Sequence, residues 1–310
     1  MTMFVKFLFR KALILLASLF FIITATFFLM KAIPGDPLSE EQGIPHEIHE
    51  NLCKHYGLND PLLKQYGKYL RSILIWDFGP SFTMRDVTIN DIIKEGFPVS
   101  ATLGLEALLL SLSAGIILGT IAALWRNRWQ DYAAMTIAVL GISVPSFVIA
   151  TITQYFLALK MNVFPVARWG TIMHTILPAL SLAALPTAFI ARLTRTKMIE
   201  VLQQDYIKTA KMKGLSQVHI IMKHVLRNTM LPIVAYLGQL SANILVGSFV
   251  IERIFGIPGL GQWMITSISN RDYTVIMGMT IFCSIILLST IFITDIAYGL
   301  LDPRIKEEAP

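Results

Sequence analysis

The chain has 310 residues, of which 55% are hydrophobic and 15% charged, and its mean hydropathy is +0.62. This composition excludes a water-soluble globular protein and indicates an integral membrane protein. The net charge of +6 would also suit a nucleic-acid-binding protein. The basic residues are distributed by membrane side, however, so topology explains them and no nucleic acid is expected.

Six charge-poor segments are long enough to cross a bilayer, which predicts an all-α integral membrane protein with six transmembrane helices. The first, residues 12–30, contains no charged residue and follows Lys6, Arg10 and Lys11. Its length and the lack of a small-residue cleavage site favour an uncleaved span over a signal peptide. The other five spans are expected at about 99–124, 133–159, 175–191, 232–251 and 274–294.

An even number of spans places both termini on one side of the membrane. That side would also hold the turn at residues 126–128 and the loop 192–231, and it would carry 15 Lys or Arg residues against 11 on the other. The positive-inside rule therefore predicts cytoplasmic N- and C-termini. The expected organisation is an N-terminus and first span in 1–31, an extracytoplasmic segment in 32–98, and a five-helix core in 99–310.

Several residues predict how these segments pack. Pro145 in the third span, and Pro178 and Pro186 in the fourth, indicate kinked helices held in a bundle. Gly115 and Gly119 predict a small-residue face that contacts another helix. Residues 61–75 are expected to form a short helix outside the membrane, and the glycine-containing loop 251–262 is expected to form a tight re-entrant turn. Asp295 lies near the inner end of the last span, where solvation at the membrane interface would be enough to explain a charged residue.

The loop 192–231 is the long polar insert of the cytoplasmic side, with helical spacing in two parts. Ile199, Leu202, Tyr206 and Ala210 lie 3, 4 and 4 residues apart, which predicts one apolar helix face. Gly214 interrupts the pattern as a helix C-cap does, and Ser216 can cap the next helix. The second apolar face is formed by Leu215, Val218, Ile221, Met222, Val225 and Leu226. The pattern alone leaves open whether this helix pair packs only on its own membrane domain or docks into a partner's groove.

This loop contains motifs that resemble the coupling loop, or EAA loop, of ABC-transporter permeases. The similarity is to the B-type permease subunits of oligopeptide and dipeptide importers. It runs from about Phe4 to Lys306, and Lys208 stands where the general motif has Glu. The motifs are Arg192-x-x-Arg195-x-x-Met198-x-Glu200, Asp205-Tyr-Ile, Thr209-Ala210-Lys211-x-Lys213-Gly214-Leu215, His224-x-Leu226, Leu231-Pro232, and outside the loop Pro34-Gly-Asp-Pro37, Asp77-Phe-Gly-Pro-Ser81 and Asp302-Pro303-Arg304.

The resemblance implies a type I ABC-importer permease architecture in the bacterial inner membrane. It further implies three kinds of partner besides membrane lipid: a second homologous permease, two cytoplasmic ATPase subunits and an extracytoplasmic peptide-binding protein. The coupling helices would transmit ATPase motion to the spans. The implied docking residues are Asp205, Tyr206, Lys208, Thr209, Ala210, Lys211, Lys213, Gly214, Leu215, His224 and Leu226.

Three polar residues within the spans are candidates for the transport pathway. Glu106 is the only acidic residue well inside a span, which suggests a proton relay or a contact for a substrate ammonium group, unless it only reaches the interface. Gln239 and Asn243 would line the pathway or form interhelical hydrogen bonds. His46, His49 and Cys53 share a helix face with the spacing of metal ligands. Solvated side chains explain this cluster, and no metal is expected.

The chain contains no Walker motif, so ATP hydrolysis is expected on separate chains, and neither an enzyme nor a cofactor-binding protein is predicted. A stand-alone ion-coupled transporter would normally show paired repeats and several buried charges. We therefore expect a permease subunit of an ATP-driven, binding-protein-dependent importer of peptides. Nickel and small glycosides remain alternative substrates.

Overall fold

The computed structural model describes residues 2–33, 59–84, 86–245 and 247–301. Their regular secondary structure is helical, apart from one isolated bridge between Pro80 and Thr88, and turns and loops join the helices. The long helices are α1 (Thr2–Ala32), α4 (Ile89–Leu124), α5 (Trp129–Ser143), α7 (Ile172–Leu202), α10 (Leu226–Leu245) and α13 (Tyr273–Leu301). The short α-helices are α3 (Leu62–Leu74), α6 (Ser146–Thr153), α8 (Asp205–Met212), α9 (Gln217–His219), α11 (Phe249–Phe255) and α12 (Leu260–Ser269). Two segments are π-helical, η2 (Gln154–Lys160) and η3 (Ile220–Val225).

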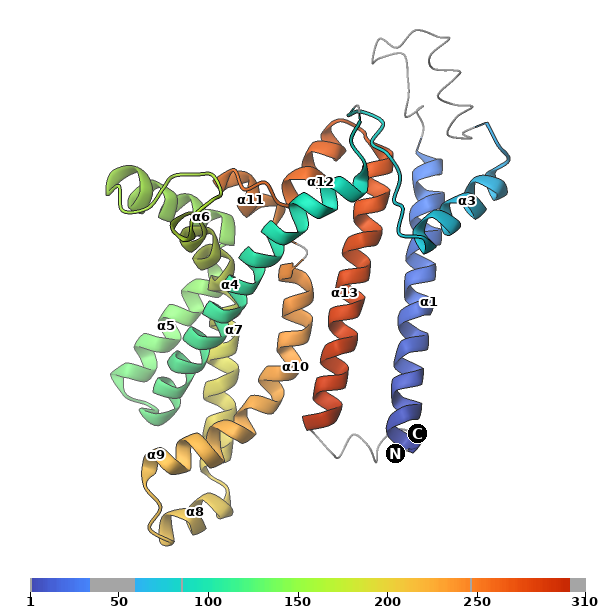
Figure 1. Ribbon diagram of the computed structural model, residues 1–310. Helices are drawn as coiled ribbons and strands as arrows, with labels where there is room; N and C mark the ends of the chain where they lie inside the picture. Colours follow the sequence, from blue (N-terminus) through green and yellow to red (C-terminus); the bar gives the residue numbers. More distant parts are fainter. Residues whose placement is uncertain (1, 34–58, 85, 246, 302–310) are drawn as a thin grey trace.

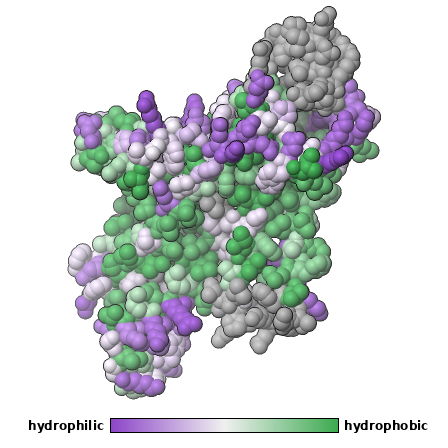
Figure 2. Space-filling model, viewed as in Figure 1, coloured by the Kyte–Doolittle hydropathy of each residue, from purple (hydrophilic) through white to green (hydrophobic). Residues whose placement is uncertain are grey.

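The long helices form one bundle with two distinct ends (Figure 1). Helix α1 begins and α13 ends at the end of the bundle from which α8 and α9 protrude, whereas α3, α11 and α12 lie at the opposite end. Figure 2 shows a hydrophobic band across the middle of this face, with hydrophilic residues concentrated at both ends. This distribution is that of a protein whose middle is solvated by lipid.

Four described helices are long and apolar enough to cross a membrane, namely α1, α4, α7 and α13. A fifth span results if α5 is counted together with α6 and η2, which are bent by 104° at the break between them. Helix α10 lies where the fifth span was expected, but it is not among the described helices that are long and apolar enough to cross a membrane. The count of six and the cytoplasmic position of the termini stay predictions.

The third span, expected at 133–159 with a kink at Pro145, is divided into two helical pieces. Helix α5 ends at Ser143, and Val144 has extended backbone angles, with φ −95° and ψ 122°. A residue before proline avoids the helical region for steric reasons, and here Pro145 follows. The sequence indicated a kink at Pro145, and the structure shows a full break.

Helix α4 begins about ten residues before the expected span, because a capping box starts it at Ile89. Thr88 Oγ1 accepts a hydrogen bond from Asp91 N at 3.2 Å, and the Asp91 carboxylate accepts one from Thr88 N at 3.2 Å. These two bonds satisfy backbone donors that a helix start leaves free. The expected boundary between residues 98 and 99 therefore falls inside α4.

Helices α4 and α7 pack closely through the two glycines of α4, as the sequence predicted. A Cβ atom on Gly119 would lie 2.5 Å from the Ala191 carbonyl oxygen, and one on Gly115 would lie 2.7 Å from the Ile190 side chain. Real side chains do not approach so closely. Glycine is therefore required at both positions for this backbone contact.

An ion pair joins the beginning of α5, just after the turn from α4, to α7. Arg195 Nε donates to Asp131 Oδ1 at 2.6 Å and Nη2 donates to Oδ2 at 2.7 Å. Asp131 is buried and also accepts from Asn127 N at 2.9 Å. This two-pronged geometry orients both side chains, so α7 is held at the end of the bundle from which α8 emerges.

A second ion pair joins α1 to α13 at the same end. Lys11 Nζ lies 2.7 Å from Asp295 Oδ2. The expectation that solvation alone accounts for Asp295 is therefore wrong. The two residues are 284 positions apart, and no local sequence pattern links them.

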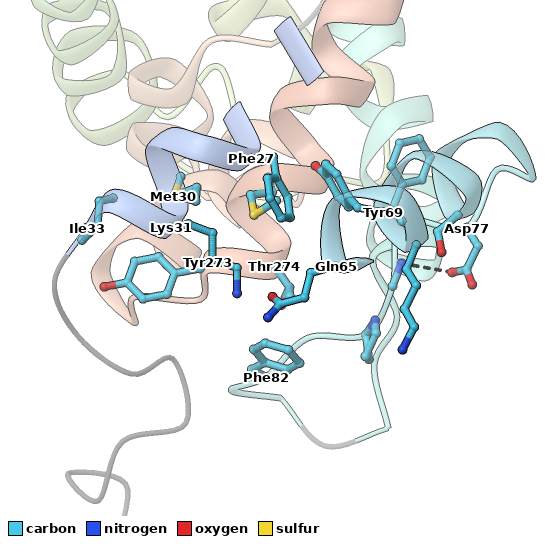
Figure 3. Close-up of a pocket in the computed structure, with 16 residues that line it drawn as sticks. Phe27, Met30, Lys31, Ile33, Gln65, Tyr69, Asp77, Phe82, Tyr273 and Thr274 are labelled. Carbon is cyan, nitrogen blue, oxygen red and sulfur yellow. Dashed lines mark hydrogen bonds between the residues drawn. The ribbon is translucent and has the colours of Figure 1, made fainter. Parts of the chain in front are cut away.

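Helix α3 contacts α1 through side chains at the opposite end of the bundle and confirms the helix expected at 61–75. The Thr24 and Tyr66 hydroxyl groups share a hydrogen bond of 2.7 Å, and the Phe27 ring contacts Tyr66 and Tyr69. Beside this contact, Figure 3 shows a pocket of about 310 Å³ between α1, α3, the loop 77–82 and the start of α13. The pocket lies far from α8 and is lined mainly by apolar and aromatic side chains.

We predict that Gly119→Ala destabilises the bundle by about 1–3 kcal/mol, because the new methyl group overpacks the α4–α7 contact. The measurement is the thermal unfolding of the purified chain in detergent. The matched control is Gly67→Ala in α3, where a Cβ atom meets nothing within 4 Å. Equal unfolding temperatures for the two variants would contradict the close packing of α4 and α7.

Candidate functional site

The most prominent feature outside the bundle is a helical hairpin that we call the tip, residues 205–225. It comprises α8, an elbow at residues 213–216, α9 and η3. Helix α7 leads into it, and η3 continues into α10 without a break, since Leu226 keeps helical angles. The tip is therefore connected at both ends to long helices of the bundle (Figure 1).

The expected continuous helix face from Ile199 to Ala210 is wrong, because the helix breaks after Leu202. Gln204 has extended backbone angles, with φ −69° and ψ 147°. The break resets the register, so Ile207 is fully buried while Tyr206 is exposed. The periodic pattern identified the apolar residues but assigned the wrong one to the core.

A small hydrophobic core holds the tip against the ends of α4 and α7. Met198, Ile207 and Val225 are fully buried, and they pack together with Ala123, Ala210 and Ile220. Each fully buried side chain of this size contributes roughly 1.5–3 kcal/mol. The tip is thus a firm extension of the bundle.

The elbow has the geometry that the sequence predicted. Gly214 has φ +73°, the left-handed region that glycine adopts at a helix end. Leu215 N donates to the Ala210 carbonyl oxygen at 3.3 Å, which closes the end of α8. Ser216 Oγ accepts from His219 N at 3.3 Å and caps the next helix, as expected.

The outer surface of the tip combines apolar side chains with basic ones. Met212 is 81% exposed, Val218 71% and Met222 64%, and the lysines of α8 and the elbow are exposed beside them. Exposed apolar side chains accompanied by basic ones are typical of a protein-binding surface. Met212 and Met222 were not among the expected docking residues. Two sequence signals could have indicated them: Met212 lies between two lysines, and Met222 follows Val218 by one helical turn.

The expected docking residues divide into an exposed and an internal group. Asp205 forms an ion pair with Lys208 at 2.8 Å, and the Lys208 ammonium holds the pKa of the Asp205 carboxyl below its usual value. Tyr206 Oη accepts from Asn228 Nδ2 at 2.6 Å, which ties α8 to the start of α10. Ala210 is buried, His224 and Leu226 are half-buried, and the exposed members are Asp205, Tyr206, Lys208, Thr209, Lys211, Lys213, Gly214 and Leu215.

A cavity of about 520 Å³ lies between the same two helices that carry the tip. Helix α7 contributes Leu182, Leu185 and Pro186 to its lining, and α10 contributes Tyr236, Leu240 and Ile244. The Tyr236 ring stacks on Phe189 with centroids 4.1 Å apart. Ser146 and residues 247–250 complete the lining, and within the described residues this lining contains no charged side chain.

Of the other expected candidates, the described structure places only the side chain of Glu106. Glu106 is half-buried on α4 and is not among the described residues that line it. Gln239 and Asn243 belong to α10, but their side chains lie outside the described residues. The cluster His46, His49 and Cys53 also falls outside them. The roles expected for these residues stay predictions.

We predict that Gly214→Leu loosens the tip without blocking it sterically. Nothing lies within 4 Å of a Cβ at this position, so the cost is the strain of a left-handed backbone, about 1–2 kcal/mol. That cost corresponds to a roughly 5- to 30-fold increase in the population of the open form, in which the tip is locally unfolded. Limited trypsin cleavage at Lys211 and Lys213 measures this form, and cleavage should accelerate by that factor.

The matched control for this experiment is Gly214→Asn, because asparagine tolerates the left-handed region far better than leucine. Its cleavage rate should stay near that of the unmodified protein. An equally fast cleavage of both variants would show that side-chain bulk, and not backbone strain, governs the elbow.

Known proteins resemble this chain over nearly its whole length. The family model described as "Binding-protein-dependent transport system inner membrane component" matches residues 115–307, and its N-terminal companion matches 3–104. A dipeptide transport system permease protein DppB of Bacillus subtilis is 52% identical over 290 residues, covering 94% of each chain. An oligopeptide transport system permease protein OppB of Haemophilus influenzae is 42% identical and covers 97% of this chain and 99% of its own.

The fold also resembles a solved structure. An inward-facing structure of the MetNI methionine ABC transporter matches with a TM-score of 0.52, covering 70% of this chain and 95% of the matched chain at 14% identity. At this identity the likeness concerns the fold alone. The family model covers more than half of the sequence, and the permeases match over nearly their whole length. The chain therefore belongs to the family of inner membrane components of binding-protein-dependent transport systems.

Proposed function

We propose that this chain is the transmembrane permease subunit of an ATP-driven, binding-protein-dependent importer of peptides. The tip carries this proposal, because it presents exposed apolar and basic side chains on a core of its own. Such a surface suits the groove of a partner protein. Two relatives of high identity bear the names of dipeptide and oligopeptide permeases, which supports peptides as the substrate class.

In the proposed assembly the tip faces the cytoplasm and docks on one of two ATPase subunits. A second homologous permease completes the pathway, and an extracytoplasmic peptide-binding protein delivers the substrate. The distribution of basic residues supports this orientation. The structure's two ends are also consistent with it, because α1 begins and α13 ends at the tip end of the bundle (Figure 1).

Coupling in this proposal uses the continuity between the tip and the cavity. Helices α7 and α10 both hold the tip and line the cavity, so a displacement of the docked tip moves two walls of the cavity together. ATP binding would favour one arrangement only if the ATPases contact the tip differently in the two states. The cavity would be this subunit's half of the pathway, with Glu106, Gln239 and Asn243 kept as further candidates.

The docking role predicts that Val218→Glu releases the ATPases, because it places a charge in the apolar centre of the docking surface. Val218 is 71% exposed, so the substitution leaves the fold of the tip intact. The measurement is mass spectrometry of the proteins that co-purify with the tagged chain after mild extraction. We expect a second permease and ATPase subunits with the unmodified chain, and loss of the ATPases with Val218→Glu.

The matched control is Leu63→Glu in α3, which is 78% exposed at the opposite end of the bundle. This variant should retain the ATPases. Gly214→Leu should weaken the ATPase association, because it loosens the same surface. Retention of the ATPases in Val218→Glu would refute docking at the tip, and a chain that purifies alone and transports under an ion gradient would indicate a secondary transporter.

The peptide assignment is tested separately in vesicles that contain the purified complex with its binding protein and ATP. We expect ATP-dependent uptake of labelled dipeptides or oligopeptides, and competition by unlabelled peptides but not by nickel ions or small glycosides. Competition by nickel or a glycoside instead would keep the importer but replace its substrate class. Uptake without ATP would contradict the ATP-driven mechanism itself.

A further inference from the structure

The most thoroughly enclosed carboxylate of the described cavity region is Glu252, which the sequence placed only in a re-entrant turn. It belongs to α11 and has no exposed surface. Its Oε1 accepts a hydrogen bond from Ser100 Oγ at 2.8 Å, and its Oε2 accepts from Gly261 N at 2.8 Å and Gln262 N at 3.3 Å. These partners come from α4 and from the beginning of α12.

Every one of these partners is a donor, so the side chain must act as an acceptor. Ser100 Oγ also accepts from Leu260 N at 2.9 Å, and its own proton is therefore directed at Glu252. The first N–H groups of a helix have no partner within the helix. Glu252 and Ser100 together satisfy three of them in α12, and a negative charge is favourable at this helix end.

Three glycines surround the carboxylate. A Cβ atom on Gly247 would lie 2.5 Å from Glu252 Oε1, one on Gly259 2.5 Å from Oε2, and one on Gly261 2.8 Å from Oε2. No side chain fits at these positions while the carboxylate stays in place. The backbone on both sides of α11 is thus drawn tightly around one functional group, with Gly247 also at φ +97°.

This arrangement adjoins the cavity. Residues 247–250 form part of the cavity lining, and they follow α10 at its end remote from the tip (Figure 1). Gly247 therefore contacts the carboxylate on one side and contributes to the cavity wall on the other. Glu252 joins this wall segment to α4 through Ser100 and to α12 through backbone donors.

We propose that Glu252 is a positioning residue for the outer gate of the transport pathway. Its carboxylate holds residues 247–250 against the end of the cavity that is remote from the tip and keeps that end closed while the tip end is open. The inference rests on the proposed function, because it takes the cavity as half of the pathway. Loss of an acceptor here leaves buried donors unpaired and loosens the segment.

The test uses the complete complex, reconstituted in vesicles, with Glu252→Gln. The amide has the same shape, but its NH₂ group cannot accept a hydrogen bond, so either the Ser100 hydroxyl proton or the N–H groups of Gly261 and Gln262 lose their acceptor. We expect about a tenfold increase in leakage of a small hydrophilic fluorophore without ATP, measured per assembled complex. ATP hydrolysis in the absence of the binding protein should rise in parallel, because closure of the outer end no longer limits the cycle.

A second variant should loosen the segment 247–250 without changing the carboxylate. Gly247→Ala introduces a methyl group against Glu252 Oε1, and it should leak as Glu252→Gln does. Ser100→Ala removes only the bridging hydroxyl group and should cause a smaller increase. These variants keep the proposal testable if Glu252→Gln fails to assemble.

The matched control is Asp272→Asn, which also removes a buried carboxylate at a helix start of the same end. Asp272 accepts from Ser81 Oγ, Thr83 Oγ1 and Val275 N, but it is not among the described residues that line the cavity. This variant should reduce the amount of assembled complex without raising leakage per complex.

Two outcomes would overturn the proposal: unchanged leakage in both Glu252→Gln and Gly247→Ala, or the same leakage in Asp272→Asn. The leakage measurement needs no transported substrate. Increased leakage in a complex that does not take up peptides would therefore retain the gate and reject the peptide assignment.

Discussion

The contact between α4 and α7 is the constraint on which the rest of the structure depends. Gly115 and Gly119 allow the two backbones to touch. At the end of this contact, the Asp131–Arg195 ion pair fixes both the position of α7 along its axis and its rotation about that axis. Burial of the Asp131 carboxylate is costly in desolvation, so the main effect of the pair with the half-buried Arg195 is to specify one arrangement and not to add net stability. The tip core can form only because this arrangement brings Ala123 of α4 beside Met198 of α7.

Helices α7 and α10 connect the tip to the cavity. Helix α7 contains Pro178 and Pro186 between its start and the tip, and α10 contains Pro232 between the tip and the cavity. A proline within a helix removes a backbone hydrogen bond and weakens the helix locally. In the proposed importer these positions would let the two helices bend while the tip itself moves as a rigid body.

Local sequence patterns were sufficient for features that depend on neighbouring residues. The glycine elbow at Gly214, the cap at Ser216, the helix at 62–74 and the contact face of Gly115 and Gly119 all follow from turn, capping or packing rules. The break at residues 203–204 did not follow, because the apolar spacing continues across it. Its detection required knowledge that Ile207 packs beneath the tip.

Interactions between distant parts of the chain could not be predicted in this way. The pairs Asp131–Arg195 and Lys11–Asp295 join residues 64 and 284 positions apart. Glu252 lay in a segment with the composition of a turn, and only the fold brings Ser100 and the start of α12 to it. The signal that could have indicated this site is the concentration of glycines at 247, 256, 259 and 261, since such a run requires close backbone contacts.

The composition of the tip core has a consequence for synthesis and quality control. Its members run from Ala123 to Val225 along the chain, so the core is incomplete until the ribosome has passed residue 225. A nascent or truncated chain that ends earlier exposes Met198 and Ile207 outside the lipid-solvated band, where chaperones and proteases recognise apolar surface. Completion of η3 at Val225 therefore marks the point at which the chain can first bury this apolar surface.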